Sequence, residues 1–156
     1  MEQPLRIGVI GSHECDERVG AAARRVGELI AEAGAALVCG GLGGVMQAAA
    51  EGASAAGGVT VGILPGRDPR AANPGIVIAI PTGLGEARNA LVVGASDAVI
   101  AIAGGWGTLS EAAFCLKNGV PLIELKSELP PLPVKEAESA EEAVRWAVDQ
   151  GLKGRG

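Results

Sequence analysis

Three glycines stand where a short apolar run ends and a helical pattern begins, in the segment Gly104-Gly-Trp-Gly-Thr108. Residues without side chains leave the backbone N–H groups open to a ligand. The helix that follows is expected to start near Thr108, and its first N–H groups carry partial positive charge. Gly104, Gly105, Gly107 and Thr108 are therefore predicted to bind a small anion such as phosphate. The alternative is a turn that only lets a strand and a helix pack closely.

Arg88 and Glu111 could add charge to this anion site. Arg88 and Asn89 stand at the start of a predicted helix, where the guanidinium could bind a phosphate with two N–H groups or pair with Glu111. The alternative for Arg88 is a solvated side chain. Glu111 could polarise a ribose hydroxyl or stabilise a developing cation, but the spacing Thr108-x-x-Glu111 also fits a capping box. The spacing leaves both interpretations of Glu111 open.

Two more glycine-containing turns follow predicted strands. Gly11 and Ser12 end the first strand, and the second strand is followed by a turn that contains Gly40, Gly41 and Gly43. Parallel strands end at a common edge, so these turns are predicted to meet the one at residues 104–108. In a proline-rich loop over residues 65–75, two arginines could close over a ligand or only form surface ion pairs, namely Arg67 and Arg70.

Several classes of site are excluded by what the sequence lacks. The glycine spacing fits neither G-x-G-x-x-G nor the phosphate-binding loop of nucleoside triphosphatases. His13 is the only histidine, so no multi-histidine metal site and no Ser-His-Asp triad can form, and we predict no metal ligands. Trp106, between the glycines, is expected to cover a ring or a subunit contact.

The composition predicts a cytoplasmic protein that binds neither nucleic acid nor membrane. Thirteen basic and eighteen acidic residues give a net charge of −5, without a basic cluster, and aromatic residues make up 2%. No leader-like segment is present, and no apolar run reaches the roughly 18 residues that span a bilayer. The three cysteines are expected to be reduced thiols in the core. Abundant alanine and glycine predict a core in which backbones approach closely.

Alternating apolar runs and helical patterns predict an α/β fold, a Rossmann-like doubly wound parallel sheet with helices on both faces. Residues 1–156 are expected to form a single domain with a core over about 5–125, a proline-rich connector over 128–135 and a terminal helix over about 139–150. Strands are predicted at 5–10, 36–39, 59–64, 76–80, 99–102 and 121–125. Helices are predicted at 16–33, 45–56, 86–95 and 109–117.

The chain resembles the LOG-like superfamily, long labelled "possible lysine decarboxylase", and within it the branch that resembles molybdenum cofactor carrier proteins. The resemblance runs from about Arg6 to Leu125. The segments that carry it are Gly104-Gly-Trp-Gly-Thr-Leu-Ser-Glu111, Gly40-Gly-Leu-Gly-Gly-Val-Met46, Ala87-Arg-Asn-Ala-Leu-Val-Val93, Leu64-Pro-Gly-Arg-Asp-Pro69, Ile80-Pro-Thr-Gly-Leu-Gly85 and Ser96-Asp-Ala-Val-Ile-Ala101.

This resemblance implies two functions. Carrier proteins bind molybdenum cofactor, whose pterin ends in a phosphate, and protect it until it is passed on. LOG enzymes are phosphoribohydrolases that cleave the N-glycosidic bond of cytokinin nucleoside 5′-monophosphates, and their motif residues correspond to Arg88 and Glu111. AMP would be a related substrate. The resemblance also implies a homodimer or homotetramer formed through helices.

The sequence departs from the hydrolase pattern at two positions. LOG enzymes have proline where this chain has Ala103, and lysine where it has Asn89. The carrier function is therefore the first expectation, with the cofactor as cargo, and the hydrolase is the alternative. Lysine decarboxylation is rejected because it normally needs pyridoxal phosphate, and no lysine is marked for a Schiff base.

Overall fold

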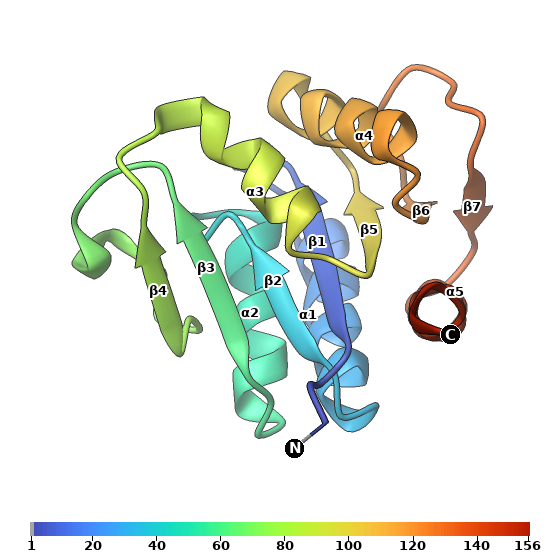
Figure 1. The fold of residues 1–156 in the computed structure, drawn as a ribbon, viewed down its shortest axis with the longest axis horizontal. Coiled ribbons are helices and arrows are strands. Elements are labelled where there is room, and N and C mark those ends of the chain that lie inside the picture. The colour runs from blue at the N-terminus through green and yellow to red at the C-terminus, as the bar shows by residue number, and fades with distance from the viewer. Residues whose placement is uncertain (1) are drawn as a thin grey trace.

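The computed structural model describes residues 2–156. They form one parallel sheet with helices on both faces (Figure 1). The strands are β1 (Arg6–Gly11), β2 (Ala36–Cys39), β3 (Thr60–Leu64), β4 (Ile78–Pro81), β5 (Ala98–Ile102), β6 (Leu122–Leu125) and β7 (Lys135–Ala137). The helices are α1 (Glu17–Glu32), α2 (Val45–Ala55), α3 (Asn89–Gly94), α4 (Trp106–Asn118) and α5 (Ala140–Arg155), with short 3₁₀ helices η1 (Pro69–Ala71) and η2 (Gly85–Arg88).

The strand order β4-β3-β2-β1-β5-β6-β7 confirms the doubly wound topology. The chain builds outward from β1 to β4, returns to the middle, and then builds outward again from β5 to β7. The winding direction therefore reverses between β1 and β5, where Gly11 lies opposite Ile102. In such sheets, ligands bind beyond the carboxyl ends of the strands at this reversal point.

Two apolar layers hold the helices on the sheet. Helices α1, α2 and α5 cover one face, with Val26, Ile30 and Ala147 in its core. Helices α3 and α4 cover the other face through Val92, Val93, Ala112 and Cys115. Strand β5 is buried along its whole length because both layers pack against it, which agrees with its uninterrupted apolar sequence.

The predicted close approach of backbones is confirmed where α1 crosses α2. A Cβ atom added at Gly27 of α1 would overlap the backbone of Ala49, and one added at Gly52 of α2 would overlap the backbone of Arg24. These two helices therefore pack almost backbone to backbone. Large side chains are not needed to fill this part of the core.

Several predicted boundaries are wrong. The segment 86–95 is divided into η2 and α3, and α5 continues to Arg155, five residues beyond its predicted end. The proline-rich connector runs into β7, an edge strand that the sequence did not predict, because two of its three residues are exposed and charged. Helix α4 begins at Trp106, two residues before the start expected near Thr108 and three before the predicted helical range 109–117. That last difference changes the interpretation of Thr108 and Glu111.

Candidate phosphate-binding site

A small cleft lies at the point where the winding direction reverses. It is formed by the turn after β1, the junction of η2 with α3, and the start of α4. Its volume is about 150 Å³. The residues that line it are Gly11, Ser12, His13, Met46, Arg88, Asn89, Gly105, Trp106, Gly107, Thr108 and Glu111. Eight of these had been predicted as site residues from the sequence.

The N-terminus of α4 opens into this cleft without a capping side chain. Its N-cap is Gly105, and the first helical hydrogen bond runs from Leu109 N to Gly105 O at 2.9 Å. By contrast, Asp16 caps α1 and Ser139 caps α5, each through a side-chain oxygen. The N–H groups of the first turn of α4 are consequently open to an anion from outside the helix.

The capping-box interpretation of Thr108 and Glu111 is wrong. Because α4 starts at Trp106, Thr108 is the third residue of the helix and cannot be its N-cap. Glu111 lies one turn further on, and no described residue donates a hydrogen bond to its carboxylate. Both residues are buried, Thr108 at 3% and Glu111 at 8% exposure. Glu111 therefore belongs to the wall of the cleft.

The glycines of the predicted site serve two different structural purposes. A Cβ atom added at Gly105 or Gly107 would have no neighbour within 4 Å, so these glycines border open space. A Cβ atom at Gly11 would lie 2.5 Å from Ile102 O, and one at Gly40 would lie 2.7 Å from Arg88 Nη2. Gly11 and Gly40 are therefore required by packing, whereas Gly105 and Gly107 leave room for a ligand.

Ser12 joins the two turns that meet at the reversal point. Its hydroxyl oxygen accepts a hydrogen bond from Gly104 N at 3.0 Å, and its carbonyl oxygen accepts one from Val45 N at 3.0 Å. The amide of Gly104 is thus occupied within the protein, unlike the amides at the start of α4. The hydroxyl proton of Ser12 stays available to a ligand in the cleft.

Arg88 is buried at 7% exposure, which contradicts the alternative of a solvated side chain. Its Nε donates to Ile63 O at 2.9 Å and its Nη2 donates to Gly40 O at 3.4 Å. A third hydrogen bond joins Nη1 to Asn89 Oδ1. Because all three acceptors are formally neutral, they orient the guanidinium without cancelling its charge. Arg88 therefore supplies a fixed positive charge to the cleft.

Asn89 connects Arg88 to the first turns of α4. Its Oδ1 accepts from Arg88, and its Nδ2 donates to Ser110 Oγ at 3.2 Å. Ser110 in turn donates to Gly107 O at 2.7 Å. This chain of hydrogen bonds links η2 to the glycine-rich end of α4. Asn89 thus holds the Arg88 guanidinium in place relative to the start of α4.

Burial raises the pKa of the Glu111 carboxyl from 4.5 to about 7. The Arg88 guanidinium opposes this shift, although the two side chains do not form a direct ion pair. Near neutral pH, the protonated and the ionised form of Glu111 are therefore both populated. A protonated Glu111 leaves the charge of Arg88 uncompensated in the cleft.

Some residues predicted for the site lie outside the cleft. Gly40, Gly41 and Gly43 do not line it, although Gly40 makes room for Arg88. Gly104 lines a neighbouring hollow instead. Arg67 lies against the turn at Gly83, and Arg70 forms an exposed ion pair with Asp68 at 3.0 Å. In this structure neither arginine closes over the cleft.

Met46 also lines the cleft, although its residue type does not predict a place in a binding site. Its backbone lies in the first turn of α2, one of the two helices that start at the reversal point. The sequence position directly after Gly40-Gly-Leu-Gly-Gly44 could have indicated its place. An apolar side chain at the start of a helix does not, however, indicate a binding role from the sequence alone.

A second hollow of about 390 Å³ adjoins the cleft. Both are lined by Gly105 and Trp106, and Trp106 is 85% exposed. The remaining walls of this hollow are Gly104, Leu109, Glu128, Leu129 and Pro130. Its size lies in the range of pockets that hold small organic molecules, whereas the cleft alone is too small for one.

The backbone at the end of β5 has an unusual conformation. Ala103 has a φ of 53°, in the left-handed region, and its N–H donates to Leu125 O at 3.2 Å. The proline ring fixes φ near −65° and has no N–H group to donate. The proline of the hydrolase motif therefore cannot occupy this position in the observed conformation.

Among residues 2–156, no cluster of three or more His, Cys, Asp or Glu side chains could hold a metal ion. No helix of this part of the chain is long and apolar enough to cross a membrane. Two of the three cysteines, Cys39 and Cys115, are buried as expected. Cys15 is exposed, so the prediction that it is a core thiol is wrong. It stands before the start of α1, where the chain runs over the surface.

Comparisons with known proteins agree with this architecture. The chain is 37% identical to the molybdenum cofactor binding protein of Rippkaea orientalis, with a TM-score of 0.89 over 96% of this chain and 98% of that one. It is 32% identical to the molybdenum cofactor carrier protein of Chlamydomonas reinhardtii, with a TM-score of 0.86 over 97% and 99%. An uncharacterized protein of Archaeoglobus fulgidus is 46% identical over 149 residues, which is 96% of this chain and 98% of that protein.

A family model also matches most of the sequence. It covers residues 4–150 and describes the SLOG cluster4 family. The match and the solved structures confirm the resemblance to the LOG-like superfamily and to its carrier branch. The chain belongs to the SLOG cluster4 family.

Proposed function

We propose that this protein binds molybdenum cofactor and holds it as cargo, with the terminal phosphate at the start of α4. The observation that carries the proposal is the uncapped N-terminus of α4, where Gly105 and Gly107 open into the cleft. Two relatives that cover nearly the whole chain are described as molybdenum cofactor binding or carrier proteins. Their ligand ends in a phosphate, the group that this cleft is large enough to hold.

The charges in the cleft favour a phosphate. Backbone N–H groups at a helix start attract an anion, and the buried guanidinium of Arg88 adds a full positive charge. Glu111 would repel a phosphate when ionised, but burial raises its pKa to about 7. The cleft can therefore take up a proton with the anion and keep its charge balanced.

The rest of the ligand would occupy the adjoining hollow. The hollow shares Gly105 and Trp106 with the cleft, so one molecule can reach both. A planar heterocycle such as a pterin would contact the apolar side chains of Leu109 and Leu129 and the indole of Trp106. This arrangement leaves the phosphate in the smaller cleft and the ring in the larger hollow.

The proposal can be tested by loading the protein with molybdenum cofactor released anaerobically from a molybdoenzyme. After gel filtration, molybdenum in the protein fraction is measured by mass spectrometry. Gly107→Leu should reduce the retained molybdenum at least tenfold, because the new side chain enters the open space at the start of α4. The matched control is Gly154→Leu in α5, which also borders open space but lies outside the cleft.

Competition by sulfate separates binding at this site from unspecific retention. Sulfate should displace the cofactor from the wild type and from Gly154→Leu, because it resembles the phosphate. If the wild type retains no molybdenum, the carrier function is wrong. If Gly107→Leu retains as much as the wild type, the placement of the phosphate is wrong.

A second function is favoured by one observation. A carboxyl with a pKa of about 7 beside a buried arginine is suited to general acid–base catalysis, and Glu111 and Arg88 are the motif residues of LOG phosphoribohydrolases. Against it stands the left-handed backbone at Ala103, which excludes the proline of the hydrolase motif. We therefore rank hydrolysis of nucleoside 5′-monophosphates second.

The hydrolase is tested by incubating the protein with AMP or a cytokinin nucleoside 5′-monophosphate. Release of free base and ribose 5-phosphate that is lost in Glu111→Gln would establish the enzyme. Stoichiometric binding of the cofactor without turnover of either nucleotide would establish the carrier. A cytoplasmic location and the absence of a nucleic-acid partner remain predictions from the composition.

A further inference from the structure

The hollow beside the cleft has one charged residue in its walls, Glu128. Its other walls are formed by glycine, proline, leucine and tryptophan residues. Glu128 lies in the segment between β6 and β7, on the side of the hollow opposite the start of α4. In a mostly apolar pocket, the few polar groups fix the orientation of a ligand and decide which ligands bind. Glu128 is therefore the residue that could give this hollow its specificity.

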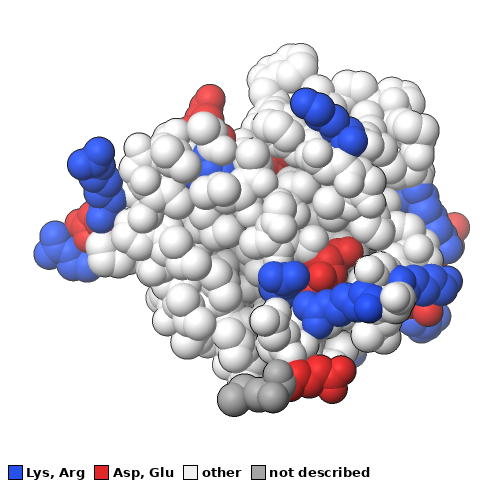
Figure 2. Space-filling view, viewed as in Figure 1, with Lys and Arg blue, Asp and Glu red and all other residues white. Residues whose placement is uncertain are grey.

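The Glu128 carboxylate is free to bind a ligand. No residue among 2–156 donates a hydrogen bond to it or forms an ion pair with it, and its side chain is exposed. No lysine or arginine lines the hollow. Figure 2 also shows few charged side chains over α3 and α4, the helices on this face of the sheet. A ligand in the hollow would thus meet a carboxylate with both oxygens unpaired.

The cleft and the hollow have opposite electrostatic character. The cleft combines the open N–H groups at the start of α4 with the guanidinium of Arg88, so it attracts negative charge. The hollow carries the negative charge of Glu128, so it attracts N–H groups. Because Gly105 and Trp106 line both, one molecule can occupy the two together. The combined site suits a ligand that is anionic at one end and donates hydrogen bonds at the other.

We propose that Glu128 selects ligands whose ring has two adjacent donors, an amino group beside a ring N–H. This inference rests on the proposed function, since the phosphate must be held at the start of α4. A carboxylate has two acceptor oxygens side by side and accepts both hydrogen bonds at once. Pterin and guanine share this edge, whereas adenine has an acceptor nitrogen beside its amino group. Glu128 would therefore bind the edge of a pterin or guanine ring and repel that of adenine, while the indole of Trp106 covers the ring.

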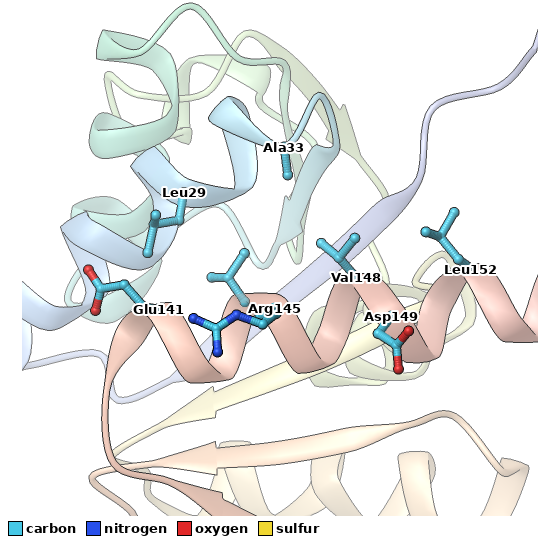
Figure 3. A pocket seen from close by; sticks show the side chains of 8 residues that line it. Leu29, Ala33, Glu141, Arg145, Val148, Asp149 and Leu152 are labelled. Atoms are coloured by element: carbon cyan, nitrogen blue, oxygen red, sulfur yellow. The ribbon is translucent and has the colours of Figure 1, made fainter.

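A groove between α1 and α5 also combines apolar walls with carboxylates, but it does not suit such a ligand. Its volume is about 440 Å³, and Figure 3 shows Glu141 and Asp149 on α5 beside its apolar side chains. Both carboxylates are already paired, Glu141 with Arg25 at 3.0 Å and Asp149 with Lys153 at 3.0 Å. The groove shares no residue with the cleft. A ligand whose phosphate lies at α4 therefore cannot reach it.

The test compares the binding of guanosine 5′-monophosphate and inosine 5′-monophosphate, which lacks only the amino group beside the ring N–H. Calorimetry at pH 7 measures the affinity of the full chain for each. The wild type should bind the guanosine nucleotide about tenfold more tightly, because the inosine nucleotide leaves one carboxylate oxygen without a donor. In Glu128→Gln the ratio should fall to about twofold or less, since an amide offers only one acceptor oxygen. Glu141→Gln is the matched control and should keep the tenfold ratio.

Sulfate and circular dichroism complete the experiment. Excess sulfate should displace both nucleotides from the wild type, because both are held by a phosphate. Circular dichroism shows whether each variant is folded, and Glu128 is exposed, so its substitution leaves the core unchanged. The inference is overturned if the wild type binds both nucleotides equally, if Glu128→Gln keeps the tenfold ratio, or if Glu141→Gln loses it.

A failure of this inference differs from a failure of the proposed function. If sulfate binds but neither nucleotide does, the position of the phosphate stands and the role of Glu128 is overturned. If neither the nucleotides nor sulfate bind, the phosphate site itself is wrong, and the role of Glu128 is overturned with it.

Discussion

Raising the pH from about 5 to about 8 should destabilise the wild-type protein through Glu111. Its pKa rises from 4.5 to about 7 on folding, because the carboxyl is buried with no hydrogen-bond donor among the described residues. Between these two values the folded state binds more protons than the unfolded state, so stability falls as the pH rises. Each pKa unit corresponds to about 1.4 kcal/mol, which gives a total loss of about 3 kcal/mol.

The loss is fully developed only above the folded pKa of about 7 and absent below the unfolded value of 4.5. Urea unfolding at a series of pH values measures it, with Glu111→Gln as the reference because glutamine has nearly the same shape and does not titrate. Burial also raises the pKa of Glu124, so the wild-type curve alone would not identify the residue. Glu124→Gln is the control that removes this second contribution.

The difference in unfolding free energy between wild type and Glu111→Gln should change by most of this amount over the pH range. In Glu124→Gln, the part of the pH dependence of stability that is due to Glu111 should remain. A difference that stays constant with pH would refute the reasoning. It would mean that Glu111 is solvated in the folded protein and that the cleft is more open than the structure indicates.

Three further predictions concern the same cleft. Sulfate does not titrate in this range, and calorimetry should show that it binds the wild type up to about tenfold more tightly at pH 6 than at pH 8, because the neutral Glu111 carboxyl does not repel the anion. In Glu111→Gln the sulfate affinity should be the same at both pH values. Arg88→Lys should lower the unfolding free energy by about 2 kcal/mol in urea, since an ammonium cannot reach Ile63 O and Gly40 O together; an unchanged value would contradict the role of these bonds. In thermal unfolding, Ala103→Gly should stabilise the folded protein by about 1 kcal/mol and Ala103→Pro should destabilise it by about 3 kcal/mol, because only glycine adopts the left-handed backbone easily. The opposite order of stabilities would show that the turn after β5 is misplaced.

The fold could be predicted largely because its strands are short, apolar and followed by turn residues. Strand β5 is the clearest case, since its continuous apolar sequence matches burial on both faces. Strand β7 could not be predicted, because only Ala137 of its three residues is buried. Its pairing with β6 depends on tertiary structure, and edge strands of this kind carry little sequence signal.

The site was predicted less completely than the fold, since the sequence could not show which glycines serve packing. Gly40 and Gly105 look equivalent in the sequence, yet Gly40 makes room for the Arg88 guanidinium and Gly105 borders open space. The capping-box prediction failed for a similar reason. Whether Thr108 or Gly105 is the N-cap depends on where the backbone turns after Ala103.

The two uncapped helices at the reversal point also differ in a way that only the structure reveals. Helix α2 has a glycine N-cap, Gly44, as α4 does, and no side-chain cap. Its first N–H, however, donates to Ser12 O, and Gly44 packs directly on the backbone of Ser12 and His13. The turn after β1 thus closes the start of α2, while the same Ser12 leaves the first turn of α4 open by bonding only Gly104 N. Ser12 therefore occupies the first N–H of α2 but no N–H in the first turn of α4, where the glycine N-cap leaves the terminus open to an anion.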